Sequence, residues 1–152
     1  MPKLAFLYAT GDGVKLNKKK AIELYRFSAD RGVVHAQYLL SKELDAEFIA
    51  YADAEIAKFE ATPARERREI DEDALMARLY ADRQSIVKEV YRYARLSAEQ
   101  GFIPAMRAVG ICYGQGHGVE RDVDEARRWL DRAFAAGDAG AAAALETLEL
   151  DA

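Results

Sequence analysis

Apolar residues recur along the chain with the spacing of amphipathic helices. The clearest stripe falls at i, i+3, i+4, i+7 and i+8 and comprises Ala21, Leu24, Tyr25, Ser28 and Ala29. Gly32 follows this stripe, at the point where a left-handed residue commonly ends a helix. A second helix is expected to begin at once, near Val34. The pattern therefore predicts helices separated by turns that contain glycine.

The helical pattern repeats along the sequence. At a shift of 105 residues, Tyr8, Gly11, Gly13 and Val14 recur as Tyr113, Gly116, Gly118 and Val119. In the same register Gly32 corresponds to Gly137, and a third copy ends at Gly101. The step from Gly101 to Gly137 is 36 residues, and 105 is three steps of 35. A period of this length is typical of stacked helix pairs.

These residues form a pattern that resembles Sel1-like repeats, which are relatives of tetratricopeptide repeats. An aromatic residue, a Gly-x-Gly-Val loop and later Ala-x-x-(Leu/Trp) and Ala-x-x-Gly steps occur in residues 4–36 and 103–141. Residues 70–105 resemble the pattern with a shorter loop that lacks the glycines. The resemblance implies a single all-α domain over residues 1–152, an α-solenoid of stacked antiparallel helix pairs. The expected units are 3–32, a degenerate 33–68, 69–101 and 102–137, followed by a capping helix over 138–150.

Residues 45–69 depart from the pattern. No Gly or Pro interrupts the stretch from Val34 to Ala61, and its apolar residues keep a helical rhythm. Either one long helix runs through this stretch, or a helix bends near residues 44–47 into a degenerate second helix. The period of 35 favours a degenerate repeat over an insertion. Thr62-Pro63 is expected to end the helix, and the acidic residues 71–73 are expected to begin the next one.

Composition and charge narrow the classes of protein that the chain can represent. With 51% hydrophobic and 32% charged residues, the chain can bury a core. A net charge of −4 argues against general affinity for nucleic acid. No run of about 18 apolar residues is present, so no membrane span is expected. With one cysteine and no recognisable secretion signal, we expect a cytoplasmic protein, or a periplasmic one if the N-terminus is trimmed.

The sequence offers no set of residues typical of catalysis or cofactor binding. Cys112 is expected to be a small core residue, and His117 a turn residue. His35 and His117 lie in different units, without the spacing of a metal site. The loop at 114–118 lacks the Lys-Ser/Thr of a phosphate-binding loop. We therefore expect no enzyme activity, no cofactor and no metal, although Cys112, His117 and a carboxylate brought together would revive a hydrolase.

The Sel1-like resemblance implies a protein–protein adaptor of the kind found in bacterial regulation, secretion or toxin neutralisation. In related repeats the first helix of each pair lines the groove, and by that analogy the polar groove candidates are Gln37, Ser41, Arg78 and Arg107. The charged turn of the atypical segment adds Arg65 and Arg68 as contact candidates. The alternative is a self-assembling repeat unit that forms a homodimer through its open N-terminal end, at residues 3–10. A hydrolase, an activity linked to some family members, is the third hypothesis.

Overall fold

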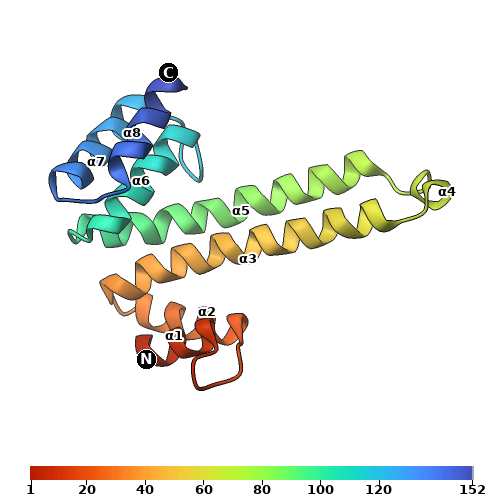
Figure 1. The fold of residues 1–152 in the computed structure, drawn as a ribbon, viewed down its shortest axis with the longest axis horizontal. Coiled ribbons are helices and arrows are strands. Elements are labelled where there is room, and N and C mark those ends of the chain that lie inside the picture. Colours follow the sequence, from red (N-terminus) through yellow and green to blue (C-terminus); the bar gives the residue numbers. More distant parts are fainter. Residues whose placement is uncertain (152) are drawn as a thin grey trace.

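A computed structural model describes residues 1–151, and within that range the chain is helical without strands (Figure 1). Its elements are α1 (Pro2–Thr10), α2 (Lys18–Ala29), α3 (Val34–Ala61), α4 (Ala64–Arg67), α5 (Glu72–Glu99), α6 (Ile103–Gln115), α7 (Val123–Ala135) and α8 (Ala141–Leu150). The predicted all-α class is confirmed.

Consecutive helices form antiparallel pairs. α1 packs on α2, α3 on α5, and α6 on α7, while α8 packs against both α7 and α6. The first and last pairs lie on opposite sides of the root of the middle pair, near the left edge of Figure 1. The predicted stack of helix pairs with a terminal helix is therefore confirmed.

The middle pair is much longer than its neighbours. α3 and α5 contain 28 residues each, whereas α6 and α7 contain 13 each. In the register of the repeat, α6 corresponds to residues 34–46 at a shift of 69, and α7 to residues 87–99 at a shift of 36. Residues 47–86 have no counterpart in the last pair beyond its seven-residue loop, 116–122. We call residues 47–86 the arm, which stands clear of the rest of the chain (Figure 1).

The sequence left open whether residues 34–61 form one long helix or a helix that bends near residues 44–47, and the structure shows one long helix. α3 is a single helix from Val34 to Ala61, without a bend that starts a second helix. The expected units 33–68 and 69–101 each contribute one long helix, and these two helices pair with each other. The physical reason is the continuous helical rhythm of both stretches, which contain no Gly or Pro to break them.

The ends of the arm helices follow local sequence signals. Thr62 precedes a proline and has extended backbone, with φ −68° and ψ 132°, which ends α3. α4 forms in the charged turn at the tip. Asp71 then caps α5, because its side chain accepts a hydrogen bond from the Ala74 amide at 2.9 Å. The predicted stop and start are both confirmed.

The core lies in the stack and not in the arm. One cluster joins α1, α2, α3 and the root of α5, with Tyr25 and Leu40 almost fully buried. A second joins α5, α6 and α7 around Val109 and Trp129, and a third lies between α7 and α8 around Leu130 and Leu148. The arm contributes none of the residues of these clusters, so the stack holds together by its own packing.

Candidate functional site

Two of the predicted groove residues, Gln37 and Ser41, are buried. They retain 3% and 2% of their exposure. Gln37 donates a hydrogen bond to the Ala29 carbonyl at 3.2 Å and accepts one from Gln100 at 2.8 Å. The Ser41 hydroxyl donates to the Tyr38 carbonyl at 2.7 Å. Both side chains are thus held within the packing between helices and are not open to a partner.

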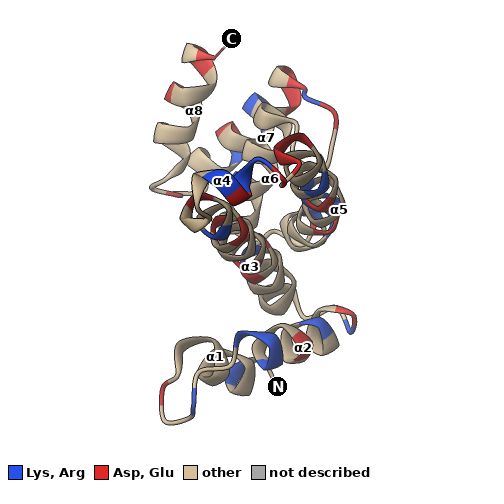
Figure 2. Cartoon of the chain, turned by 90° about the vertical axis from the view of Figure 1, so that its right-hand side faces the viewer, with Lys and Arg blue, Asp and Glu red and all other residues tan. Residues whose placement is uncertain are grey.

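The four arginine candidates are more accessible but lie apart. Arg107, on α6, lies 3.5 Å from the Asp138 carboxylate. Arg78, on the arm, donates to Glu55 at 2.7 Å. Arg65 and Arg68 lie in and next to α4, and both are exposed. Figure 2 shows α4 at the end of the arm, with basic residues in blue. The six residues therefore do not form one groove, because two are buried and four are distributed over the arm and the last helix pair.

The arm root brings together residues that the sequence analysis considered for catalysis. Asp45 and Arg83 form an ion pair of 3.0 Å close enough to influence both Cys112 and His117. Burial is the main cause that raises the pKa of the Cys112 thiol to about 11. The thiol is therefore protonated at neutral pH, which is the opposite of an activated nucleophile. Burial also lowers the pKa of His117, so that this imidazole is uncharged at neutral pH.

Metal-binding geometry is missing from the part of the chain that the structure describes. Among residues 1–151, no group of three or more His, Cys, Asp or Glu side chains is arranged to hold a metal ion. His35 instead packs edge-on against Phe102, with ring centroids 5.1 Å apart. His35 therefore has a packing role at the contact between α3 and the start of α6.

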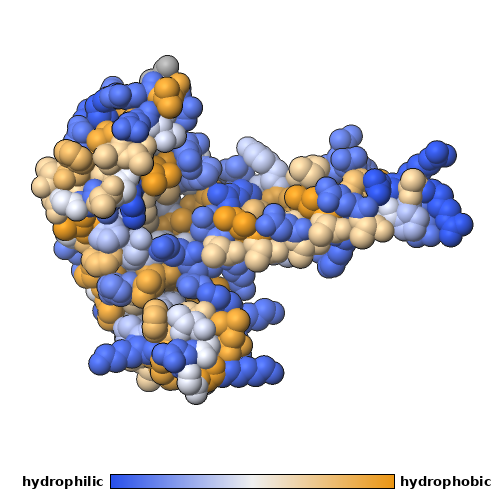
Figure 3. Space-filling view, viewed as in Figure 1, coloured by the Kyte–Doolittle hydropathy of each residue, from blue (hydrophilic) through white to orange (hydrophobic). Residues whose placement is uncertain are grey.

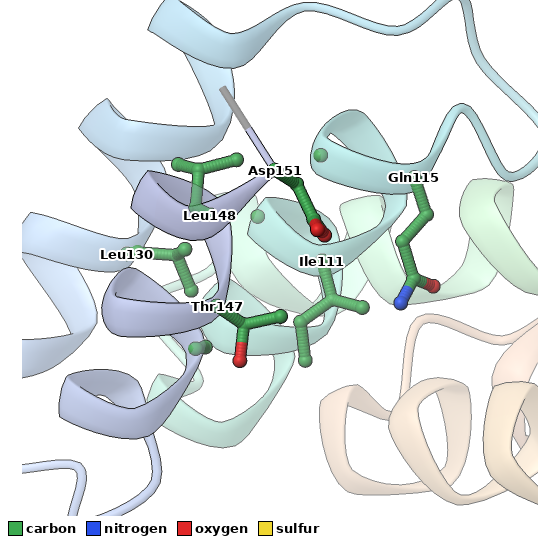
Figure 4. A pocket seen from close by; sticks show the side chains of 9 residues that line it. Ile111, Gln115, Leu130, Thr147, Leu148 and Asp151 are labelled. Carbon is green, nitrogen blue, oxygen red and sulfur yellow. The ribbon is translucent and has the colours of Figure 1, made fainter.

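Sequence reasoning missed a small hollow between α6, α7 and α8 (Figure 4). It has a volume of about 160 Å³, and Ile111, Leu130 and Leu148 form its apolar wall. Gly110 and Gly114 lie one turn apart on α6 and leave this space. The signal was Gly110, because a glycine inside a helical stretch commonly marks close packing. The sequence analysis placed Gly114 in the loop at 114–118, whereas the structure places it in α6.

A second missed hollow lies between α1 and the start of α3. Its volume is about 450 Å³, and its lining is Pro2, Lys3, Phe6, Leu7, His35 and Leu39. Phe6 is 51% exposed there. This largely apolar surface coincides with the N-terminal end that the sequence analysis singled out for self-association.

The geometry of the two outer helix pairs agrees with a known family. The family model for the Sel1 repeat matches residues 3–33 and 103–138, which are the α1–α2 and α6–α7 pairs. These two segments match as Sel1 repeats. The segments that match are those in which the sequence analysis found the clearest pattern, whereas the arm lies outside both matches.

Two further comparisons find proteins that are similar to this chain. The crystal structure of a Sel1 repeat protein from Oxalobacter formigenes superposes with a TM-score of 0.62 and 23% sequence identity, over 95% of this chain and 84% of that one. This likeness shows the shared solenoid fold. The chitin synthase regulator SKT5 of Malassezia restricta is 42% identical over 60 residues. That match covers 40% of this chain and only 4% of the length of the regulator.

Sel1 repeats generally mediate protein–protein interaction. Within residues 1–151, none of the helices combines the length and apolar character that crossing a membrane requires. The surfaces that Sel1 repeats and the arm present are therefore the features on which a functional proposal has to rest.

Proposed function

We propose that this protein is a scaffold that holds another protein. The observation that carries the proposal is the long arm, which projects from between two Sel1 repeats and buries little of its own surface (Figure 1). Repeat stacks of this kind offer extended surfaces for a partner without a catalytic pocket. Regulation, secretion and neutralisation of a toxin in bacteria are the settings for such a scaffold, and the single cysteine favours the cytoplasm.

The exposed arginines are the contact candidates that the geometry leaves available. Arg65 has 86% of its side chain exposed, and its bridge to Glu66 is 3.5 Å long. Arg107 keeps a third of its side chain exposed beside Asp138. The proposal contains no catalytic step, since the Cys112 thiol stays protonated at neutral pH.

Affinity capture from a lysate of the source organism, read by mass spectrometry, tests the scaffold. The full chain is compared with Arg65→Glu/Arg68→Glu and with a matched charge reversal on the last pair, Arg128→Glu/Arg132→Glu. A partner that the full chain retains stoichiometrically supports the scaffold. A partner lost only from the first variant assigns the arm tip as a contact. Recovery of nothing but the protein itself contradicts the proposal.

A self-assembling unit is the second candidate, favoured by the apolar hollow beside α1. A second copy could cover Phe6 and Leu39 there and form a homodimer. Sedimentation velocity over a hundredfold range of concentration tests this candidate. A dimer that Phe6→Lys abolishes supports it, whereas a monomer at every concentration contradicts it. Glu23→Lys, on the exposed face of α2, is the control for a changed charge.

A further inference from the structure

The arm is a helix pair without a third layer. Of its residues, only Leu79 is buried, at 6% exposure. Ile49, Tyr51, Met76 and Tyr80 are all at least 40% exposed. The face of the arm in Figure 3 accordingly shows apolar patches among hydrophilic side chains. Helices in water gain most of their stability from packing an apolar face, so an arm of this length has packing capacity that the chain itself does not use.

One flank of the arm carries two separate hollows. Near the root, a hollow of about 350 Å³ lies between α3 and α5, and a second of about 450 Å³ lies nearer the tip. Together they form what we call the arm groove, whose apolar floor is Leu44, Phe48, Tyr51, Phe59, Leu75 and Ile86. Its α3 side spans 16 residues, from Leu44 to Phe59, which corresponds to about 24 Å of helix.

Carboxylates line the edges of the arm groove. Glu47 of α3 and Asp82 of α5 both line the hollow near the root, and neither forms an ion pair within residues 1–151. In the hollow near the tip, Glu55 is bridged by Lys58 at 2.8 Å and by Arg78 at 2.7 Å. Asp71, which caps α5, also lines this hollow and forms no ion pair among the described residues, so the groove has unpaired carboxylates at both ends.

The net charge of the chain resides in the arm. Residues 47–86 contain six Lys or Arg and ten Asp or Glu, so that the rest of the chain carries sixteen of each sign. The arm thus has a net charge of −4 and the remainder a net charge of zero. Two arms of the same protein repel each other, whereas a basic partner is attracted.

From these observations we infer that the arm groove binds an amphipathic helix of a partner protein, about four turns long, with an apolar face flanked by Lys and Arg. The apolar face packs between α3 and α5 as a third helix, and the basic flanks meet Glu47 and Asp82. The net charge of −4 on each arm disfavours a second copy of the arm as the occupant. The inference rests on the proposed scaffold function and names the chemistry of its partner.

A designed peptide provides the probe. An 18-residue amphipathic helix with a leucine stripe and Lys/Arg flanks is compared with a peptide that has the same stripe and Glu flanks. Fluorescence anisotropy measures binding to the full chain. The basic peptide is expected to bind, and the acidic one to bind at least tenfold more weakly. Equal binding of both peptides, or of neither, overturns the inference.

Matched charge reversals locate the site on the arm. Glu47→Lys/Asp82→Lys alters the groove. Asp53→Lys/Glu60→Lys makes the same change in charge on the opposite flank of α3. Asp53 and Glu60 lie four residues after Ile49 and Ile56, so each pair shares a helix face, and that face does not line the groove. The groove variant is expected to bind the basic peptide at least tenfold more weakly, and the control less than threefold. Equal losses in the two variants would mean that only net charge matters and would overturn the groove.

The peptide test and the lysate capture can fail separately. If capture yields a partner that the groove variant still binds, and the basic peptide does not bind, then the scaffold stands and the arm groove is wrong. If the basic peptide binds in the groove but capture returns only the protein itself, the groove stands and the scaffold function fails. Circular dichroism of both variants verifies that the arm remains helical.

Discussion

Two loop glycines in equivalent repeat positions meet different surroundings. Gly13 and Gly118 both have left-handed backbone, with φ +71° and +72°. A Cβ on Gly13 would meet no atom within 4 Å, whereas one on Gly118 would overlap the Val87 carbonyl of α5. Gly118 therefore combines a backbone conformation that favours glycine with close contact between the last pair and the middle pair.

Replacement of these glycines by alanine separates the two effects. Gly13→Ala is expected to lower the free energy of unfolding by about 1–2 kcal/mol, the cost of left-handed backbone for a residue with a Cβ. Gly118→Ala is expected to cost about 3 kcal/mol or more, because backbone atoms of α5 must also move. Urea unfolding of both variants measures the difference. Equal losses would show that the contact with α5 contributes nothing.

The raised pKa of Cys112 predicts how stability changes at high pH. The pKa of an exposed thiol is 9.0, whereas burial raises the pKa of Cys112 to about 11. Between these values the unfolded chain has lost the proton that the native chain retains, so stability falls as pH rises. The loss reaches about 2–3 kcal/mol at most. Urea unfolding at pH 8 and pH 10.5 should show a larger decrease for the native chain than for Cys112→Ala; parallel decreases would contradict this.

The sequence indicated apolar stripes and helix-ending glycines well, but it could not distinguish buried from exposed polar residues. Gln37 and Ser41 are residue types suited to a groove, and analogy placed them there. The Ser41 hydroxyl is satisfied by the Tyr38 carbonyl of its own helix, whereas Gln37 is satisfied by the Ala29 carbonyl of α2 and by the Gln100 amide directly after α5. Such pairings depend on how helices stack, which a stripe on one helix does not specify.

At the scale of elements, the arm has nearly the length of one repeat, so the repeat period does not reveal it. Residues 47–86 replace a seven-residue loop and so add 33 residues, close to the 36-residue step of the repeat. A shift of 105 residues then matches three periods although the shift contains only two helix pairs. The sequence thus predicted the helices themselves but not their grouping, because both groupings give the same period.

The arm is expected to be dispensable for folding. Replacement of residues 47–86 by a copy of the loop 116–122 removes 34 of the 117 helical residues but none of the three core clusters. The shortened chain should lose about a third of its total helical signal and still unfold in one cooperative transition. Circular dichroism during a thermal scan measures both quantities. A shortened chain that aggregates or melts without a transition would show that the arm supports the stack.

At the scale of the whole molecule, the arm makes the surface larger than a compact protein requires. The accessible surface is 9250 Å², whereas a folded monomer of 16.9 kDa exposes about 7,700 Å². The excess is about a fifth. The source of the excess is the arm. Its helices α3 and α5 pack against each other there, but no third element covers them (Figures 1 and 3).

Small-angle scattering should detect this shape. A compact chain of 152 residues has a radius of gyration of about 15 Å. The full chain is expected to exceed that value clearly, and the chain with the shortened loop to approach it. A full chain that scatters as a compact particle would mean that the arm folds back onto the stack.

The separation of charge between arm and stack gives the molecule a permanent electric dipole. Beyond residue 46, α3 extends by 15 residues, or about 22 Å, which exceeds the screening length of about 8 Å at physiological salt. In such salt the charge at the arm tip is largely screened at the stack, so that a partner meets a negative arm and a stack without net charge as separate surfaces. At 0.01 M salt the screening length of about 30 Å exceeds the arm, and the protein orients as a single polar particle with its arm toward positive charge.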